Sequence, residues 1–546
     1  MLLTSFLAQA RAFCRVRGKS GPGVGAIRKR PSARRAFFER LESRQVLSGG
    51  IVVASVGATT SDRALDSFLA SDGKIVVAGD TNSNRGDFAA LRFQANGSLD
   101  PTFDNDGVVV TSMSVYADYA SAAVLYPATS TDPEKILLAG KADFVKKLAR
   151  GQSVVQADFA LARYNADGTL DRTFNYQATK KTTTYGTVLT DLGGNDIIRD
   201  ALVQDGKIVV VGESNASGTR DFALARYTAD GRLDSTFGGT GVVTTSFGRT
   251  FHSGEGVALQ QGKILAVGYV SDGSGGEDLA LARYNLNGTL DTTFGASDPQ
   301  NPLAGTGKVV SNITVNDEIF NVAVYPAGSQ YQDYIVVVGQ IYGLIPGVAW
   351  TLGVARFTPE GSLDTGFGQS GFVLSPDTTF GYDVALQPDG KIVAAGWKTV
   401  DNERQFFVVR YDTSGNLDPT FGSGGEVTTP IPNLRGVGRS VWIQSDGKIV
   451  ATGYAYEPAS PQRSYIALAR YDTFGNLDPS FGDPLAGNTV ASPAALTDAA
   501  LADAGRQQLA LAALLQYEDQ LQAKPAARSK GLEVPAIDLA LLDLAS

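Results

Sequence analysis

Residues 158–174 read DFALARYNADGTLDRTF, and variants of this stretch occur seven times along the chain. Successive copies are separated by 54 to 73 residues. Self-similarity at a period of this length indicates an array of structural repeats. The arginine of each copy marks its position: Arg92, Arg163, Arg226, Arg283, Arg356, Arg410 and Arg470.

A second phrase precedes each copy, as in GKIVVAG at 73–79 and GKIVVVG at 206–212. Its apolar residues are consecutive, which is typical of a strand buried on both faces. An Asp-Gly turn before it predicts a hairpin with the preceding segment. Each unit is therefore predicted to hold four strands: one such as DVALQP (383–388), the apolar strand, the FALARY strand and a strand of the GVVTT type.

Units of this size cannot bury both faces of a sheet alone, so they must pack on one another. Seven units favour an all-β fold, a closed seven-bladed β-propeller of four-stranded blades. An open β-solenoid is the main alternative. Eight segments resemble the fourth strand, so either Ile51–Val53 or Thr489–Ala491 completes the last blade. We expect the N-terminal copy, because it would join the first and last blades and leave no open edge.

The middle of the quoted stretch, NADGTLD, resembles half of a calcium-binding loop, in which Gly is sixth and the first residue supplies an oxygen ligand. If Gly168 is sixth, the first residue is Arg163, and all seven copies have Arg there. A cation in that position opposes calcium. A three-residue hairpin loop with Gly in the left-handed conformation explains the pattern better. We therefore predict hairpins rather than metal sites.

The hairpin register places Arg163 opposite Asp171, and the same spacing of eight residues occurs in every copy. Strand alternation puts this Arg beside apolar neighbours, which predicts a partly buried ion pair in each blade. The predicted acidic partners are Asp100, Asp171, Asp234, Asp291, Asp364, Asp418 and Asp478. A Phe three residues after each Asp is predicted to pack between blades: Phe103, Phe174, Phe237, Phe294, Phe367, Phe421 and Phe481. We interpret all of them as structural, and we predict no catalytic, cofactor-binding or metal-binding residue.

The consensus from ALQPDGKIVVAG through LARYNADGTLDTTFG resembles the delta-60 repeat family of bacterial surface and secreted proteins. The resemblance covers residues 50–485 and implies a propeller-like array without a catalytic motif. The segment RRAFFERLESRQVLS at 34–48 resembles the LEPR-XLL export segment of planctomycete proteins, with Ser43 where that motif has Pro. The two resemblances imply an exported protein, extracellular or at the cell surface.

We divide the chain into three parts. Residues 1–48 form a basic leader or export segment that we expect to be disordered, and residues 49–493 form the propeller. Residues 494–546 are rich in Ala and Leu and are expected to be a helical tail. The charged residues of the tail argue against a membrane span there.

Composition excludes several classes of function. The leader holds 11 Lys or Arg and 2 Asp or Glu, whereas the remainder holds 36 and 54, so the body would repel nucleic-acid phosphates. The one cysteine, Cys14, lies in the leader, which excludes disulfides and zinc-thiolate sites from the body. The one histidine, His252, is expected in an exposed loop, and any mechanism that needs two histidines is excluded.

Three functions remain open. We expect a non-enzymatic, monomeric binding or surface-structural module without a cofactor, whose partner is a glycan, a peptide or a surface protein. Inserts at 141–157 and 340–350 are candidate contact regions, and the second contains the candidate contact aromatics Tyr342 and Trp350. A hydrolase or lyase that acts on polysaccharide would need paired carboxylates. The third function is that of a calcium-stabilised adhesion protein.

Overall fold

The computed structural model describes residues 45–482, except the short segments 58–60, 82–85, 131, 148–152, 179–182, 272, 274–275, 299, 314–315, 344, 346–347, 349 and 378. The elements in this part of the chain are 31 β-strands. No helix of the length and apolar character needed to cross a membrane occurs in the described part. Residues 1–44 of the predicted leader and the predicted helical tail lie outside the described residues.

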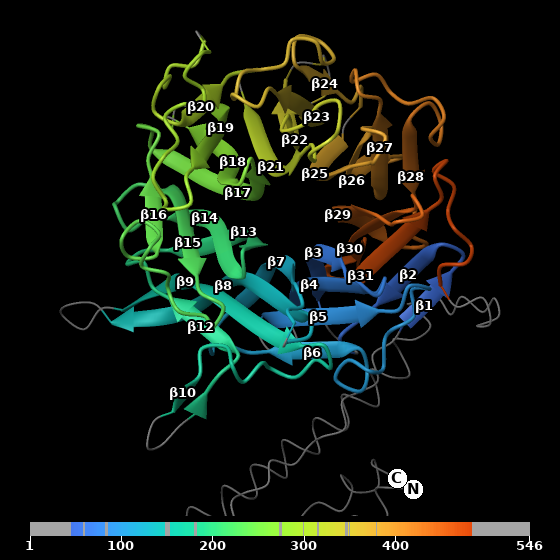
Figure 1. The fold of residues 1–546 in the computed structure, drawn as a ribbon. Helices are drawn as coiled ribbons and strands as arrows, with labels where there is room; N and C mark the ends of the chain where they lie inside the picture. Colours follow the sequence, from blue (N-terminus) through green and yellow to red (C-terminus); the bar gives the residue numbers. More distant parts are fainter. Residues whose placement is uncertain are drawn as a thin grey trace, which may run out of the picture. The chain divides into compact units, whose positions relative to one another are not determined.

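Seven antiparallel sheets surround a central axis, and the predicted seven-bladed β-propeller is confirmed (Figure 1). The innermost strand of each blade contacts the innermost strands of both neighbours. These strands are, from blade 1 to blade 7, β3 (Asp62–Leu69), β7 (Asp118–Tyr126), β13 (Asp196–Gln204), β17 (Phe251–Gln260), β21 (Asp317–Val324), β25 (Thr379–Leu386) and β29 (Arg435–Ile443).

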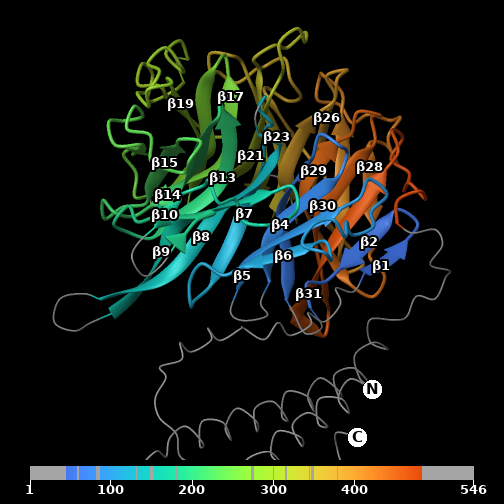
Figure 2. The same ribbon diagram turned by 60° about the horizontal axis from the view of Figure 1, so that its bottom comes forward.

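The second and third strands of each blade are the apolar phrase and the FALARY phrase of the repeat. The second strands are β4 (Ile75–Thr81), β8 (Lys135–Lys147), β14 (Lys207–Ser214), β18 (Lys263–Ser271), β22 (Ile335–Tyr342), β26 (Ile392–Val400) and β30 (Ile449–Glu457). The third strands are β5 (Asp87–Phe93), β9 (Ser153–Asn165), β15 (Asp221–Tyr227), β19 (Glu277–Tyr284), β23 (Trp350–Phe357), β27 (Glu403–Tyr411) and β31 (Ser460–Tyr471). Strands β8 and β9 extend beyond the other hairpins (Figure 2).

The fourth strands are short and lie on the outside of the ring. In blades 1 to 6 they are β6 (Val108–Thr111), β12 (Thr187–Thr190), β16 (Val242–Thr245), β20 (Lys308–Ser311), β24 (Phe372–Leu374) and β28 (Glu426–Thr429). A two-stranded ribbon, β10 (Gln177–Ala178) with β11 (Thr183–Thr184), precedes β12.

The N-terminal copy of the fourth strand completes blade 7. Strand β2 (Ile51–Ala54) pairs antiparallel with β31, so the two ends of the array meet in one sheet. Strand β1 (Gln45–Ser48) pairs with β2 and gives this blade five strands instead of the expected four. Strand β1 covers the last four residues of the predicted leader. The competing C-terminal copy lies outside the described residues.

The core lies between the blades. Val76 and Phe88 of blade 1 belong to the same buried cluster as Leu138 and Tyr164 of blade 2, and similar clusters occur between the other blades. The second and third strands have their apolar side chains buried on both faces, since each sheet is covered by a neighbour on either side. This packing requires the ring, because an isolated blade would expose both faces.

The expectation of an exposed loop for His252 is wrong. This side chain is 0% exposed and lies in β17, where it approaches the backbone carbonyl of Arg220 and the carboxylate of Asp221 in the preceding blade. Burial lowers the pKa of His252. In four other blades the corresponding residue is a buried aspartate: Asp62, Asp118, Asp196 and Asp317. The neighbouring polar residues suggested a loop, whereas the position is the start of an innermost strand.

Candidate functional site

Each innermost strand contains a β-bulge at the same place in the repeat. In blade 1 the register shifts between Ala64 and Asp66, so Leu65 is the extra residue. The seven bulge residues differ in chemistry: Leu65, Ser121, Arg199, Glu255, Phe320, Tyr382 and Arg439. A bulge redirects a side chain out of the regular alternation of the strand.

The glycine that ends the second phrase makes room for this bulge. A Cβ atom at Gly79 would lie 1.7 Å from the backbone oxygen of Arg63, and the six equivalent glycines meet the same obstacle at 1.6–2.0 Å. Any side chain there would push the innermost strand away. The recurrent Gly of GKIVVAG therefore has a structural reason that its position in a strand did not reveal.

All seven bulge residues line one cavity on the axis of the ring. The cavity has a volume of about 290 Å³, and every blade contributes to its wall. Five further residues complete the lining: Arg63, Asp66, Tyr119, Asp200 and Asn321. A concave site with convergent polar and aromatic groups is the usual form of a small-molecule binding site. We name it the channel cavity.

The three arginines of the channel cavity have different surroundings. Arg63 forms an ion pair of 3.0 Å with Asp80. Arg199 lies 3.3 Å from Glu213 and 3.7 Å from Glu255. Arg439 stacks on the ring of Tyr382 at 3.9 Å, and it forms no ion pair within the described part of the chain.

Three aspartates follow bulges and tie neighbouring blades together. Asp66 accepts hydrogen bonds from the backbone N–H groups of Ser67 at 2.7 Å and of Ala123 in blade 2 at 2.8 Å. Asp200 and Asp383 make the equivalent bonds to the blades that follow them. Burial raises the pKa of Asp66 to about 6, of Asp383 to about 7 and of Asp200 to about 8, and mutual repulsion adds to the shifts of the last two.

These shifts predict a loss of stability at alkaline pH. The folded pKa of Asp200 is about 8, above the unfolded value of about 4, so the folded state binds this proton more tightly. The resulting stability is complete below the unfolded pKa and is lost as the pH rises through the folded pKa. We expect the melting temperature to fall from about pH 5 to about pH 9, and to fall less in the variant Asp200→Asn. A flat profile over this range would contradict the assignment.

The aromatic residues singled out in the sequence lie beside the channel cavity. Tyr342 and Trp350 face each other across β22 and β23, with ring centroids 5.0 Å apart. Trp350 lies 6.4 Å from Phe380, which lies 5.2 Å from the cavity residue Tyr382. Trp397 stacks on Phe380 at 5.1 Å. We name these five rings the aromatic row; it leads from the exposed Tyr342 to the wall of the channel cavity.

Glu318 of β21 and Glu277 of β19 form a pair of carboxyl groups across the interface of blades 4 and 5. Burial and the neighbouring Glu277 raise the pKa of Glu318 to about 8, and Gln340 donates a hydrogen bond to Glu318 at 2.5 Å. Glu255 of the channel cavity contributes to the same shift. Glu318 therefore stays protonated near neutral pH and can donate a proton or a hydrogen bond.

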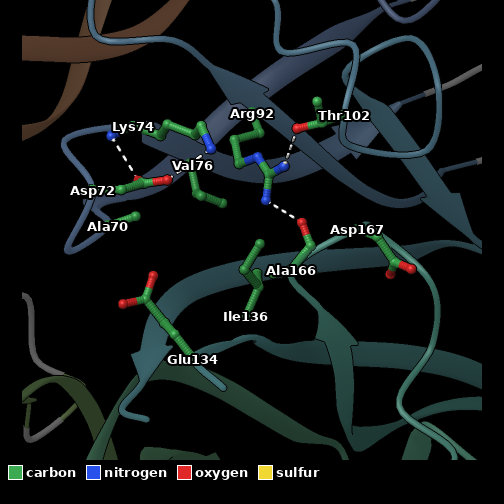
Figure 3. A pocket seen from close by; sticks show the side chains of 10 residues that line it. All are labelled: Ala70, Asp72, Lys74, Val76, Arg92, Thr102, Glu134, Ile136, Ala166 and Asp167. Atoms are coloured by element: carbon green, nitrogen blue, oxygen red, sulfur yellow. Dashed lines mark hydrogen bonds and ion pairs between the residues drawn. The ribbon is translucent and has the colours of Figure 1, made fainter.

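The structure brings each predicted Arg–Asp pair together, at nitrogen–oxygen distances of 2.7–3.0 Å. Each arginine also donates to a backbone carbonyl in the hairpin of the next blade, as Arg92 does to Ala166 (Figure 3). Each stacks on the predicted Phe of its own blade at 4.4–4.8 Å. The pair therefore joins two blades, and we name this arrangement the staple.

The hairpin glycine completes the staple. Gly168 has φ of +87°, as the predicted loop requires, and the other six are similar. These glycines also lie against the Phe of the preceding blade: a Cβ at Gly231 would be 2.8 Å from the ring of Phe174. Each Phe is 0% exposed. The glycine is thus needed both for its backbone conformation and for close packing between blades.

The lysine of the GKI phrase was missed by the sequence reasoning. Lys207 lies 2.7 Å from Asp234, and five other blades have an equivalent contact of 2.7–3.5 Å. In blade 5 the position is Tyr334. Although burial opposes it, hydrogen bonds from Lys135 and Thr173 and the nearby Arg163 hold the pKa of Asp171 at about 2. The recurrence of this Lys in the second phrase could have predicted its contact with the aspartate of the staple.

A second cavity, of about 320 Å³, lies between blades 1 and 2 (Figure 3). Its cations already have partners: Arg92 contacts Asp100 at 2.7 Å and Thr102 at 3.0 Å, and Lys74 contacts Asp72 at 2.7 Å. Figure 3 shows Arg92 and Ala166 meeting across this crevice. The crevice belongs to the staple, so the channel cavity is the better candidate for a ligand.

Among the described residues, one group of acidic side chains outside the staple could hold a metal ion. Carboxylate oxygens of Asp158, Asp191 and Asp196 lie within 4.8 Å of one another. Lys146 pairs with Asp191 at 3.0 Å, and burial together with the two neighbouring acids raises the pKa of Asp158 to about 6. This group is not in the hairpin loops that resemble a calcium site.

The seven repeats match a family model described as a domain of unknown function (DUF5122) beta-propeller. The matched residues are 70–103, 135–174, 204–237, 262–294, 335–367, 387–421 and 444–481. This is a propeller repeat protein. A comparison with curated proteins finds no match to the propeller repeat protein.

The solved structures that the propeller repeat protein matches are similar to it only at a low level. Sqt1 from Chaetomium thermophilum is 12% identical with a TM-score of 0.37, over 78% of this chain and 100% of that one. The GH32 β-fructofuranosidase BmSUC1 from Bombyx mori is 9% identical with a TM-score of 0.30, over 79% and 91%. The GH43 endo-arabinanase from Bacillus licheniformis is 12% identical with a TM-score of 0.24, over 51% and 94%. Likenesses at this level carry no argument about function.

Proposed function

We propose that the protein is an exported, non-enzymatic binding module whose ligand occupies the channel cavity. The observation that carries this proposal is the contrast between two sets of repeated positions. The staple has Arg and Asp in all seven blades, whereas the bulge residue that faces the channel cavity differs in chemistry from blade to blade. The residue type at the bulge is not repeated from blade to blade, and all seven bulge residues line one cavity. Such a varied lining suits the recognition of one asymmetric ligand.

The carboxylates of the channel cavity support binding rather than hydrolysis. Asp66 and Asp200 accept backbone hydrogen bonds from two blades each. Glu255 accepts a hydrogen bond from Ser253 and lies near Arg199. A general acid or base must reach the substrate with a free oxygen or proton. Although Asp200, with a pKa of about 8, keeps a proton at neutral pH, both oxygens of Asp66 and of Asp200 are engaged by backbone N–H groups and hold the wall of the cavity.

Export is proposed from the resemblances of the sequence. The repeats resemble the delta-60 family of surface and secreted proteins, and residues 34–48 resemble the LEPR-XLL segment. The partner is then a component of the cell surface or its surroundings, namely a glycan, a peptide or a surface protein. Fractionation of cells that express the full chain tests this point, and retention of all the protein in the cytoplasm would contradict it.

A glycan and peptide array probed with the full chain tests the binding function. We expect retention of a specific ligand, and a loss of about tenfold or more in affinity for Tyr382→Ala, because this ring is part of the cavity wall. The matched control is Phe474→Ala, since Phe474 is 63% exposed in the hairpin after β31 and does not line the channel cavity. Equal loss in both variants would contradict a site in the channel cavity.

The carboxyl pair favours a second candidate function, hydrolysis or lysis of a polysaccharide. Burial and a hydrogen bond with Glu277 raise the pKa of Glu318 to about 8, so Glu318 could donate a proton to a glycosidic oxygen. Release of reducing ends from a polysaccharide panel, abolished by Glu318→Gln, would establish this function in place of binding. We expect no release.

A further inference from the structure

We propose that the ligand of the channel cavity is an acidic sugar whose carboxylate binds Arg439. The inference rests on the proposed function and adds the chemical class of the ligand. It starts from one cation: among the three arginines of the cavity, Arg439 alone lacks an ion pair with a described residue.

No described carboxylate forms an ion pair with Arg439, although Asp66 and Glu255 of the same cavity interact with its charge at longer range. The side chain lies half-buried in the bulge of β29, and its Nε atom is buried with no hydrogen-bond partner. A buried donor without an acceptor is unfavourable, and a cation away from bulk water gains most from a paired anion. The nearby Asp66 and Asp383 use their oxygens for backbone N–H groups of two blades each.

The geometry of the guanidinium group specifies the kind of anion. Tyr382 covers one flat face of the Arg439 group at 3.9 Å. Because Nε is buried, the edge formed by the two terminal nitrogens, Nη1 and Nη2, is the one that can meet a planar carboxylate in a bidentate arrangement. The cation–π contact also holds the group in one orientation, which lowers the entropy lost when an anion binds.

The aromatic row indicates which class of ligand the carboxylate belongs to. Its rings continue from Tyr382 through Phe380 to Trp350 and Tyr342, with neighbouring centroids 5.0–6.4 Å apart. Flat rings of this kind pack against the C–H faces of sugar rings, and their polar atoms bind hydroxyl groups. A cavity of about 290 Å³ holds a unit of monosaccharide size rather than a segment of polymer. The terminal residue of an acidic glycan would thus enter the cavity, and the following residues would lie along the aromatic row.

Isothermal titration calorimetry with defined oligosaccharides tests the inference. The probes are tetramers of galacturonate, glucuronate and mannuronate, the methyl ester of each tetramer, and the neutral galactose tetramer. We expect at least one acid to bind and its ester to bind about tenfold or more weakly, because esterification removes the charge but keeps the sugar. Arg439→Gln should weaken binding of the acid by a similar factor without changing that of the ester, and Arg439→Lys should have an intermediate effect.

The matched control is Arg172→Gln. Arg172 also stacks on a tyrosine, Tyr185, at 5.3 Å and forms no ion pair with a described residue, but it lies in the hairpin of blade 2, outside the cavity. This variant should bind the acid like the unchanged protein, and equal losses in both variants would reduce the effect to general electrostatic attraction and overturn the inference. Unchanged melting temperatures show that the Arg439 variants are folded.

The other outcomes separate this inference from the proposed function. If acid and ester bind equally, or only the neutral tetramer binds, the ligand is not recognised through its carboxylate. The inference of an acidic sugar is then wrong, and the binding function stands. If peptides with a free C-terminal carboxylate bind through Arg439 and no sugar does, the sugar is wrong. If no sugar or peptide binds in the channel cavity, both the inference and the proposed function are wrong.

Discussion

Asp234→Ala is expected to lower the free energy of unfolding by about 3–5 kcal/mol, because it leaves a buried arginine without its counterion. Arg226 is 5% exposed and lies 2.8 Å from Asp234. Its remaining contacts, to the Leu286 carbonyl of the next blade, the Thr236 hydroxyl and the ring of Phe237, do not neutralise its charge. Lys207 and Thr236 also lose their acceptor. Urea unfolding followed by circular dichroism measures the change.

Asp230→Ala provides the control within the same hairpin. The exposed carboxylate of Asp230 accepts a hydrogen bond from Thr228 and pairs with Arg232 at 3.3 Å, both in its own turn, and the substitution keeps the backbone carbonyl that accepts from Asn175. Removing it should cost less than about 1 kcal/mol, as is usual for exposed pairs. Equal destabilisation by the two substitutions would contradict the stabilising role that we assign to the ion pair between Arg226 and Asp234.

The staple also predicts acid sensitivity. The pKa of Asp171 is lowered to about 2, and those of Asp418 and Asp478 are lowered similarly by hydrogen bonds from Thr or Ser and Lys against the effect of burial. A lowered pKa contributes stability above the unfolded value of about 4, and this is lost as the pH falls through the folded value. Together with the raised values in the channel, this places maximum stability at mildly acidic pH.

Val52→Asp is expected to open the ring and to destabilise the protein by about 4 kcal/mol or more. Val52 is 0% exposed in β2 and pairs with Leu468 of β31. It belongs to a buried cluster with Ile75 of blade 1 and Val450 of blade 7. A carboxylate there would be buried without a partner exactly where the two ends of the array meet, and thermal unfolding would show the loss directly.

Val490→Asp tests the alternative closure in the same assay. Val490 belongs to the C-terminal segment that resembles the fourth strand. Since β2 already pairs with β31, we expect no change in melting temperature. A large effect of Val490→Asp with little effect of Val52→Asp would reverse the assignment of the closing strand.

The fold and the staple could be predicted because their determinants are local and repeated. The eight-residue spacing between Arg163 and Asp171 follows from one hairpin, and the position of Gly168 fixes its loop. The number of blades follows from the number of copies. Strand β1 escaped prediction because it belongs to no repeat and is specified only by its pairing with β2.

The channel cavity could not be predicted in the same way. Its bulge residues share a position but no residue type, so a search for similarity passes over them. The bulge itself arises from pairing between two strands and the space left by Gly79 and its equivalents. His252 was misplaced for a related reason, since its buried neighbour Asp221 belongs to another blade. Tyr342 and Trp350 were noticed as aromatic residues, but their alignment with Phe380 required the ring.

The β-bulge separates the side chain that lines the cavity from the backbone that holds the strand in its sheet. Its backbone is held by a glycine on one side and by bonds to the adjoining blade on the other, so replacing the bulge side chain disturbs little of either. The side chains that line the cavity could therefore change one blade at a time while the backbone of the ring stays the same.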